Sequence, residues 1–199
     1  MIKIVGITGP SGSGKSLLCK YVSESGIPCI NADEVYHSML TPPSECLLAI
    51  REAFGADVLN EDGSLDRATM SKYVFSDQAK LDLLNRTVLP LVIKKIKSII
   101  SELEKSGNSF VVVDAPTLIE SRFNEECDLV VSVIASAETR ISRIQKRDSI
   151  SFDKAKLRIS AQKPNEFYVS ASDIVLTNDS NERNFLNQAA ELLKTIKSI

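Results

Sequence analysis

The chain has 199 residues, of which 43% are hydrophobic and 25% are charged, and its formal net charge is −2. This length and composition predict an α/β domain with an insertion, or one domain with a small cap, that buries a full core. Because the net charge is close to zero and slightly negative, we expect no nucleic-acid or membrane partner.

The four cysteines (Cys19, Cys29, Cys46 and Cys127) show no Cys-x-x-Cys spacing, and the chain has one histidine. We therefore expect no zinc site and predict reduced, partly buried thiols. The first residues lack the flanks of a signal peptide, and no apolar run reaches the roughly 18–20 residues of a membrane span. The expected protein is soluble and cytoplasmic.

Short apolar runs alternate with helical patterns along most of the chain. The predicted strands span residues 2–7, 27–30, 110–114, 128–135 and 173–177. The helical patterns between and after them span residues 16–25, 136–147 and 180–199. This alternation predicts a mostly parallel sheet covered by helices.

Residues 32–105 break the alternation, because they carry little strand signal. They contain a helical pattern at 44–54, a loop at 55–66 and two further helical stretches interrupted at Pro90. A helical insertion this long is too large for a simple crossover between strands and predicts a separate helical subdomain or cap.

The loop GPSGSGKS, residues 9–16, joins the first predicted strand to the first predicted helix and fits G-x-x-x-x-G-K-[ST]. Gly9 and Gly14 let the backbone N–H groups point at phosphate oxygens, and the following helix adds its positive end. Lys15 is expected to contact the β- and γ-phosphates, and the Ser16 hydroxyl to hold Mg²⁺. A chance glycine-rich turn is the alternative, but the strand–loop–helix context favours a nucleotide site.

The phosphate loop alone does not separate kinases from GTPases, ATPases or motors. We find no guanine-recognition signature, which disfavours a GTPase. Asp114 ends the strand FVVVD, where an acid can hold the water shell of Mg²⁺. The alternative role for Asp114 is a cap before Ala115-Pro116, and the pattern leaves both open.

Asp33 follows the second predicted strand, on the edge where open α/β sheets bind ligands. A carboxylate there can accept the proton of a substrate hydroxyl, but it can equally cap a helix that starts near residue 33. His37 follows one turn later on the same helical face. A lone histidine of this kind is more often a surface or half-buried helper than a catalyst.

Basic residues gather in 140–163, with few acids between them. They are Arg140, Arg143, Lys146, Arg147, Lys154, Lys156, Arg158 and Lys163. The three arginines at 140, 143 and 147 fall near one helical face. The segment is either a solvated helix surface or a lid whose arginines close over a transferring phosphate.

Together these motifs resemble the dephospho-coenzyme A kinase family, nearly end to end. The glycine loop is generic, whereas the blocks DG-x-LDR…VF-x-D and D-x-P-x-L-x-E are more specific. The similar segments are 6–16, 31–37, 54–77, 114–121, 127–133, 140–148, 158–162 and 172–179.

The resemblance implies transfer of the ATP γ-phosphate to the ribose 3′-hydroxyl of dephospho-CoA, giving CoA and ADP. It implies a P-loop NTPase fold with a five-stranded parallel sheet, a helical CoA-substrate domain and a lid. It makes Asp33 the general base and matches Thr8, Lys15 and Arg143 to phosphate-handling residues. The usual D-x-D is Asn31-Ala32-Asp33 here, and the usual His-Pro is Leu89-Pro90.

From this resemblance we expect a core of residues 1–31, 107–139 and 165–199, a substrate domain of 32–106 and a lid of 140–164. The expected catalytic residues are Asp33, Lys15 and Arg143, and the expected metal ligands are Ser16 and Asp114. The expected nucleotide-binding residues are Thr8, Gly9, Ser11, Gly12, Ser13, Gly14, Lys15, Ser16, Leu17, Arg147 and Asn178. Asp33 and His37 are expected at the substrate.

The expected cofactor is Mg²⁺, with ATP as co-substrate, in a monomer or weak homo-oligomer. One alternative is another small-molecule or nucleoside-monophosphate kinase. A second alternative is an ATP-binding module without catalysis.

Overall fold

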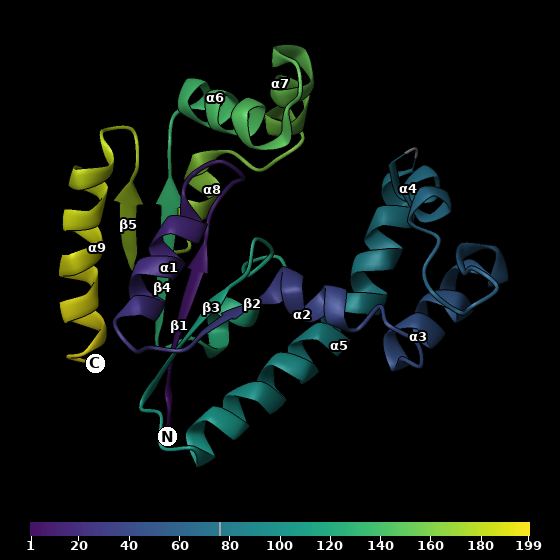
Figure 1. Ribbon diagram of the computed structural model, residues 1–199, viewed down its shortest axis with the longest axis horizontal. Helices are drawn as coiled ribbons and strands as arrows, with labels where there is room; N and C mark the ends of the chain where they lie inside the picture. Colours follow the sequence, from purple (N-terminus) through teal and green to yellow (C-terminus); the bar gives the residue numbers. More distant parts are fainter. Residues whose placement is uncertain (76) are drawn as a thin grey trace. The chain divides into compact units, whose positions relative to one another are not determined.

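The computed structural model describes residues 1–75 and 77–199, so Ser76 of the segment 54–77 lies outside the described residues. Within them, five strands form one sheet in the order β2-β3-β1-β4-β5, and every neighbouring pair is parallel (Figure 1). The strands are β1 (Lys3–Thr8), β2 (Cys29–Asn31), β3 (Phe110–Asp114), β4 (Leu129–Ile134) and β5 (Ile174–Thr177). The predicted five-stranded parallel sheet flanked by helices is confirmed.

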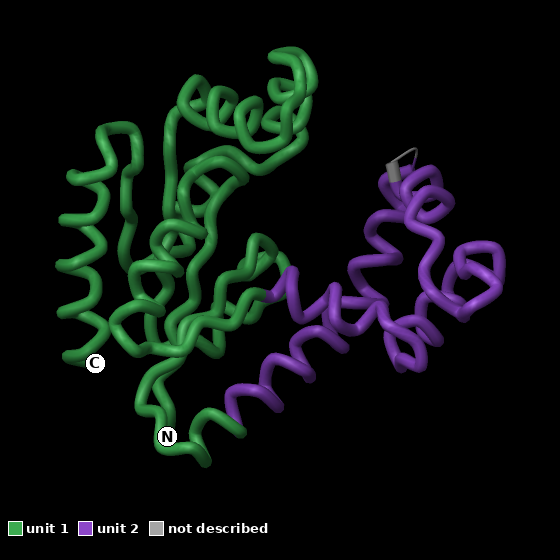
Figure 2. Tube along the Cα trace, viewed as in Figure 1, with its two compact units in different colours: residues 1–31, 102–199 green, residues 32–101 purple. Residues whose placement is uncertain are grey.

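The described residues divide into two compact units, which Figure 2 draws in different colours. Residues 1–31 and 102–199 form the unit that contains the sheet, and residues 32–101 form a helical unit. The chain leaves the sheet unit directly after β2 and returns within the last turns of α5 (Gln78–Lys105).

The core of the sheet unit forms where α1 (Lys15–Glu24) and α9 (Glu182–Ile196) meet the sheet. Val5, Ile7 and Leu18 belong to one apolar cluster with Phe185, and all four side chains have no exposed surface. Because β1 and α1 share this cluster, packing on both sides fixes the loop 9–16 that joins them.

The carboxyl ends of the parallel strands meet at one edge of the sheet. The loop 9–16 follows β1 at this edge, and α6 (Ala137–Asp148) follows β4, with Ser136 as its N-cap. In Figure 1, α6 and α7 (Phe152–Ser160) lie beyond these strand ends. The chain returns to β5 through α8 (Asn165–Val169).

The helical unit holds α2 (Ala32–Ser38), α3 (Glu45–Phe54), α4 (Arg67–Phe75) and most of α5. Side-chain caps begin two of these helices. The Ser44 hydroxyl accepts the N–H groups of Cys46 and Leu47, and the Asp66 carboxylate accepts those of Ala68 and Thr69. Short 3₁₀ turns lie at Ala56–Val58 in this unit and at Phe123–Glu126 in the sheet unit.

The predicted interruption at Pro90 is wrong, because α5 runs unbroken from Gln78 to Lys105. Proline cannot donate to the preceding turn, which costs a helix about 3 kcal/mol. A stripe of buried side chains along α5 outweighs that cost, at about 1.5–3 kcal/mol each. The stripe consists of Val88, Val92, Ile96 and Ile100.

A second proline shifts the start of β2 from the predicted residue 27 to Cys29. Pro28 has no N–H to give to the ladder. Its carbonyl still accepts the Val112 N–H at 2.8 Å, so the chain is already aligned with β3 before the strand begins.

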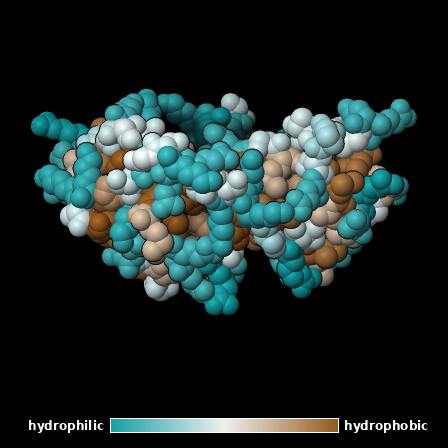
Figure 3. Space-filling model, turned by 90° about the horizontal axis from the view of Figure 1, so that it is seen from below, coloured by the Kyte–Doolittle hydropathy of each residue, from teal (hydrophilic) through white to brown (hydrophobic). Residues whose placement is uncertain are grey.

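The surface of the protein mixes polar and apolar residues. On the face in Figure 3, most atoms belong to hydrophilic or intermediate residues, with smaller hydrophobic groups between them. Among residues 1–75 and 77–199, no helix combines the length and the apolar character needed to span a bilayer.

Candidate active site

The glycine loop has the backbone that its motif predicts. Gly9, Gly12 and Gly14 have φ angles of 137°, 81° and 110°, in the range that side-chain-bearing residues rarely adopt. A Cβ atom on Gly9 would lie 2.1 Å from the Val133 carbonyl oxygen. The loop therefore passes so close to β4 that only glycine fits at this position.

Lys15 folds back over the loop that precedes it. Its Nζ donates to the carbonyl oxygens of Gly9 and Pro10, at 2.7 and 3.4 Å. The ammonium charge thus lies with the loop and the positive end of α1, where the motif places phosphate oxygens. Leu17 follows in the first turn of α1 and is half-buried.

Three arginines of α6 reach this loop from one face of the helix, as their spacing predicts. Arg140 Nε donates to the Ser11 carbonyl at 3.0 Å, and Arg147 Nη2 lies 3.5 Å from Ser11 Oγ. Arg143 Nη1 donates to the Gly12 carbonyl and to the next one along, both at 3.2 Å. The guanidinium groups therefore hold the carbonyl side of the loop.

Asp148 partly balances the positive charge of the segment 140–163. The sequence pattern did not indicate this pairing. Its carboxylate pairs with Arg147 Nε at 2.7 Å and with Arg158. Hydrogen bonding from Arg147 holds the pKa of Asp148 below its usual range. Arg147 thus shares its charge with an acid, whereas Arg140 and Arg143 contact the loop directly.

Asn178, which follows β5, connects Arg143 to the loop and is 3% exposed. Its Nδ2 donates to the Ser13 carbonyl at 2.8 Å, and its Oδ1 accepts from Arg143 Nη2 at 3.1 Å. A Cβ atom on Gly14 would lie 2.1 Å from that Nδ2. Gly14 is therefore required both by its φ angle and by the side chain packed against it.

Sequence reasoning missed Gln162, which comes just after α7. Its Oε1 accepts the Ser11 N–H at 3.1 Å and Arg140 Nη2 at 2.5 Å. Arg140 is 5% exposed, and burial lowers the pKa of its guanidinium. The similar segment 158–162 contained Gln162, but nothing in its spacing indicated a partner 151 residues away in the chain.

Ser16 and Asp114 offer oxygen ligands in the same unit. Asp114 is 6% exposed at the end of β3, in register with Ile7 of β1, and Ser16 is exposed in the first turn of α1. Cys19, one turn after Ser16, lies near Asp114. Its thiol has a raised pKa because of hydrogen bonding with Cys29, burial and the Asp114 carboxylate.

Hydroxyl and carboxylate oxygens suit Mg²⁺, which usually takes one or two protein ligands and completes its shell with water and phosphate. Among the described residues, no group of three or more His, Cys, Asp or Glu side chains is placed to hold a metal. The Ser16 hydroxyl and the Asp114 carboxylate are ligands of the kind that Mg²⁺ takes. Thr8, the last residue of β1, is buried, and its Oγ1 donates to the Pro116 carbonyl at 3.4 Å.

Asp33 and His37 belong to the helical unit. Asp33 is exposed in the first turn of α2, which begins at Ala32, so it lies inside the helix rather than at its N-cap. His37 lies one turn later and is also exposed, with its Nδ1 3.3 Å from Arg67 Nη2. Asp33 and His37 thus both lie at the surface of the helical unit.

The arrangement in the sheet unit is that of a P-loop nucleotide site, and comparison with known proteins places it in one family. The sequence profile of dephospho-CoA kinases matches residues 3–184. The chain belongs to the dephospho-CoA kinase family. The resemblance predicted from the sequence is confirmed.

Individual dephospho-CoA kinases match over nearly the whole chain. The enzyme of Carboxydothermus hydrogenoformans is 34% identical over 197 residues, covering 99% of this chain and 96% of that protein. The enzyme of Streptomyces avermitilis is 38% identical over 175 residues, covering 88% and 84%. The solved dephospho-CoA kinase of Campylobacter jejuni has a TM-score of 0.72 at 23% identity, covering 100% and 99%, and shares the fold.

Replacing Gln162 by Ala should raise the KM for ATP about tenfold, the effect of losing roughly 1.4 kcal/mol of charge-assisted hydrogen bonding. The Ser11 N–H and the buried Arg140 guanidinium lose their shared acceptor, so the loop is less ordered before ATP binds. Steady-state kinetics would show a larger change in KM than in kcat. Lys163→Ala, at the next position, is the control, and an equal effect in both variants would contradict a specific role for Gln162.

Proposed function

We propose that this protein transfers the γ-phosphate of ATP to the ribose 3′-hydroxyl of dephospho-CoA, forming CoA and ADP. Membership of the dephospho-CoA kinase family over residues 3–184 carries the proposal. The intact phosphate loop supports it, because Lys15, the loop glycines and the start of α1 form a site for a nucleotide phosphate chain.

The proposed reaction is an in-line transfer. The 3′-oxygen of the acceptor bonds to the γ-phosphorus while the bond to the β–γ bridging oxygen breaks, and ADP leaves with that oxygen. Asp33 orients the 3′-hydroxyl and takes its proton. Lys15 and Arg143 offset the negative charge on the phosphoryl group and on ADP, so the rate comes mainly from positioning and electrostatic stabilisation.

Ser16 and Asp114 would hold Mg²⁺ in this proposal, with Asp114 acting directly or through water. The positive charge of the ion would offset the negative charge of the β- and γ-phosphate oxygens. The support for this assignment is the chemistry of the two ligands and the burial of Asp114.

We assign acceptor binding to residues 32–106 and a closing lid to residues 140–164. The contacts of Arg140, Arg143 and Arg147 with the loop support a lid role for α6, because they couple its position to the phosphate site. Closing the lid would exclude water, the competing acceptor. We further propose that the enzyme is cytoplasmic, because ATP is supplied in the cytoplasm. We also propose that it acts as a monomer or weak homo-oligomer.

The test is ADP release with Mg²⁺-ATP and a panel of acceptors, namely dephospho-CoA, AMP, CMP, adenosine, shikimate and pantothenate. We expect turnover with dephospho-CoA alone, and CoA identified by mass. Turnover of a nucleotide or of shikimate would establish a different kinase on the same fold. ATP binding without turnover of any acceptor would favour a non-catalytic module.

A further inference from the structure

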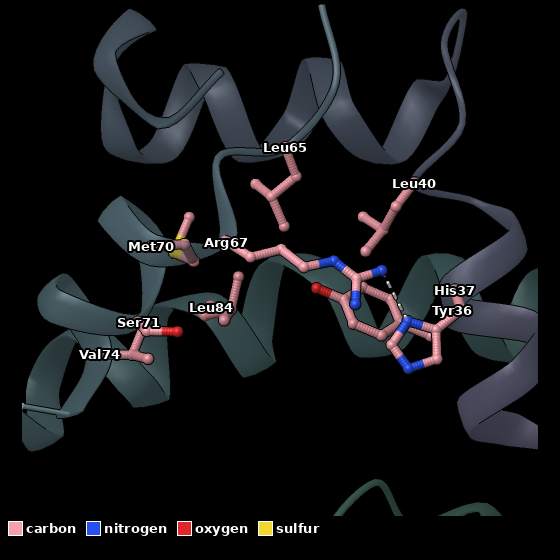
Figure 4. Close-up of a pocket in the computed structure, with 9 residues that line it drawn as sticks. All are labelled: Tyr36, His37, Leu40, Leu65, Arg67, Met70, Ser71, Val74 and Leu84. Atoms are coloured by element: carbon pink, nitrogen blue, oxygen red, sulfur yellow. Dashed lines mark hydrogen bonds between the residues drawn. The ribbon is translucent and has the colours of Figure 1, made fainter. Parts of the chain in front are cut away.

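The helical unit contains a pocket of about 230 Å³ that none of the proposed catalytic groups fills. Figure 4 shows its lining side chains gathered from α2, α4, α5 and the segments that join them. They are Tyr36, His37, Leu40, Leu65, Arg67, Met70, Ser71, Val74 and Leu84.

The body of the pocket is apolar. Leu40 and Met70 are 8% and 4% exposed and form its most buried part, and Leu65, Val74 and Leu84 complete the walls. Burying apolar groups of a ligand against such walls contributes about 25 cal/mol per Å². The volume is below the roughly 300–1,000 Å³ of pockets that hold a whole drug-sized ligand, so the pocket suits one segment of a larger molecule.

The mouth of the pocket is cationic. Figure 4 shows the Arg67 side chain crossing the pocket, with its guanidinium directed toward His37. Arg67 Nη2 lies 3.3 Å from His37 Nδ1, and the guanidinium can act only as a donor. None of the nine described lining residues is acidic, so the pocket places no carboxylate of its own against Arg67.

Two neutral polar groups accompany this cation. Burial raises the pKa of Tyr36, which keeps its hydroxyl protonated near neutral pH. Figure 4 shows the Ser71 hydroxyl extending from α4 into the pocket. A ligand segment with neutral amide or hydroxyl groups and apolar methyl or methylene groups, joined to an anion, matches this combination of walls and mouth.

The helix α2 links the pocket to the proposed base. Asp33 begins the turn that His37 ends, and four residues span about 6 Å of helix axis. A ligand held at Arg67 and His37 by an anionic group therefore has room to place a hydroxyl a few bonds away at Asp33. In dephospho-CoA the ribose 3′-hydroxyl and the 5′-diphosphate have this relation.

We propose that the pocket binds the pantetheine arm of dephospho-CoA, with Arg67 and His37 at its mouth meeting the diphosphate. This inference rests on the proposed function and names the part of the acceptor that the helical unit recognises. The arm is uncharged, carries two amides and several methyl and methylene groups, and is joined directly to the diphosphate. Its binding energy, remote from the reacting oxygen, would hold the ribose in place for transfer.

The first test uses the arm as a separate probe. We expect 4′-phosphopantetheine, which has the arm and one phosphate but no adenosine, to inhibit wild-type protein competitively against dephospho-CoA at saturating ATP. Failure of millimolar 4′-phosphopantetheine to inhibit a preparation that makes CoA would overturn the inference. Absence of CoA formation by the wild type would instead overturn the proposed function.

The second test either blocks the pocket with a larger side chain or removes the positive charge at its mouth. Ser71→Phe places a ring in the cavity, and we expect the KM for dephospho-CoA and the Ki of 4′-phosphopantetheine to rise at least about tenfold each, with the KM for ATP within about twofold. Ala68→Phe adds the same ring to an exposed position of α4 and is the control. Arg67→Gln should raise both acceptor constants, whereas Arg86→Gln, an exposed arginine of α5 outside the pocket, should not.

The variants also distinguish binding of the pantetheine arm in the pocket from binding of the adenine ring there. Should Ser71→Phe raise the Ki of AMP and leave that of 4′-phosphopantetheine unchanged, the pocket holds adenine and the inference is wrong. Unchanged constants in folded Ser71→Phe and Arg67→Gln would overturn it as well. Arg67→Gln and the wild-type inhibition decide the question if Ser71→Phe does not fold.

Discussion

Replacing Asp33 by Asn is expected to lower kcat by about 10²–10⁴, the usual contribution of a general base. The amide keeps the size of the side chain on the first turn of α2 but cannot take the proton of the 3′-hydroxyl. The groups that contact the phosphate loop, including Lys15 and Arg143, belong to the sheet unit and are unchanged. ATP affinity, measured by titration calorimetry in the absence of acceptor, should therefore change less than about threefold.

The matched control for Asp33 is its neighbour. Glu34→Gln removes an exposed carboxylate from the same helical turn and should leave kcat within about twofold. An equal loss in both variants would indicate a general effect of charge on α2 rather than proton transfer. Near-normal turnover of Asp33→Asn would show that Asp33 is not the base.

Replacing Gly14 by Ala is expected to abolish measurable ATP binding, because the loop cannot keep its shape. The residue has φ = 110°, which an alanine adopts only at a cost of roughly 1–2 kcal/mol. The added methyl group would also lie 2.1 Å from Asn178 Nδ2. Asn178 is buried and holds both Ser13 and Arg143, so it cannot move without releasing the carbonyl side of the loop.

Gly26→Ala separates the cost of a positive φ angle from the clash with Asn178 in the Gly14 substitution. Gly26 has a similar φ of 88°, but no atom lies within 4 Å of its added Cβ. We expect Gly26→Ala to lower the melting temperature and leave the Kd for ATP unchanged. Tight ATP binding by folded Gly14→Ala would contradict the packing of Asn178 against the loop as the reason for glycine.

The arginines of α6 have a role in the structure that the sequence did not indicate, beside the phosphate contact that it predicted for a lid. In this structure Arg140 and Arg143 donate to backbone carbonyls of the loop, so they fix its shape. Contact of Arg143 with a transferring phosphate stays a prediction. A guanidinium has donors in addition to those used here, so shaping the loop and contacting phosphate are compatible.

The sequence predicted the fold well where local signals and tertiary packing agree. β3 was predicted at its observed bounds, because a run of buried β-branched residues between turn signals has few alternatives. The interruption predicted at Pro90 is wrong, because the buried stripe that stabilises α5 across Pro90 depends on tertiary packing and not on local propensity. The sequence predicts the loop 9–16 directly, because all of its groups are adjacent in the chain.

By itself, the sequence determined the phosphate loop, the parallel sheet and the family, since each depends on contiguous residues or on the order of short motifs. Only the tertiary structure decided three other features. Gln162 and Arg140 meet at Ser11, and Asn178 packs against Gly14. Arg67 and His37 lie at the mouth of an apolar pocket. The physical reason is that these contacts join residues distant in the chain. No periodicity or spacing encodes them, and they form only when separate elements pack together.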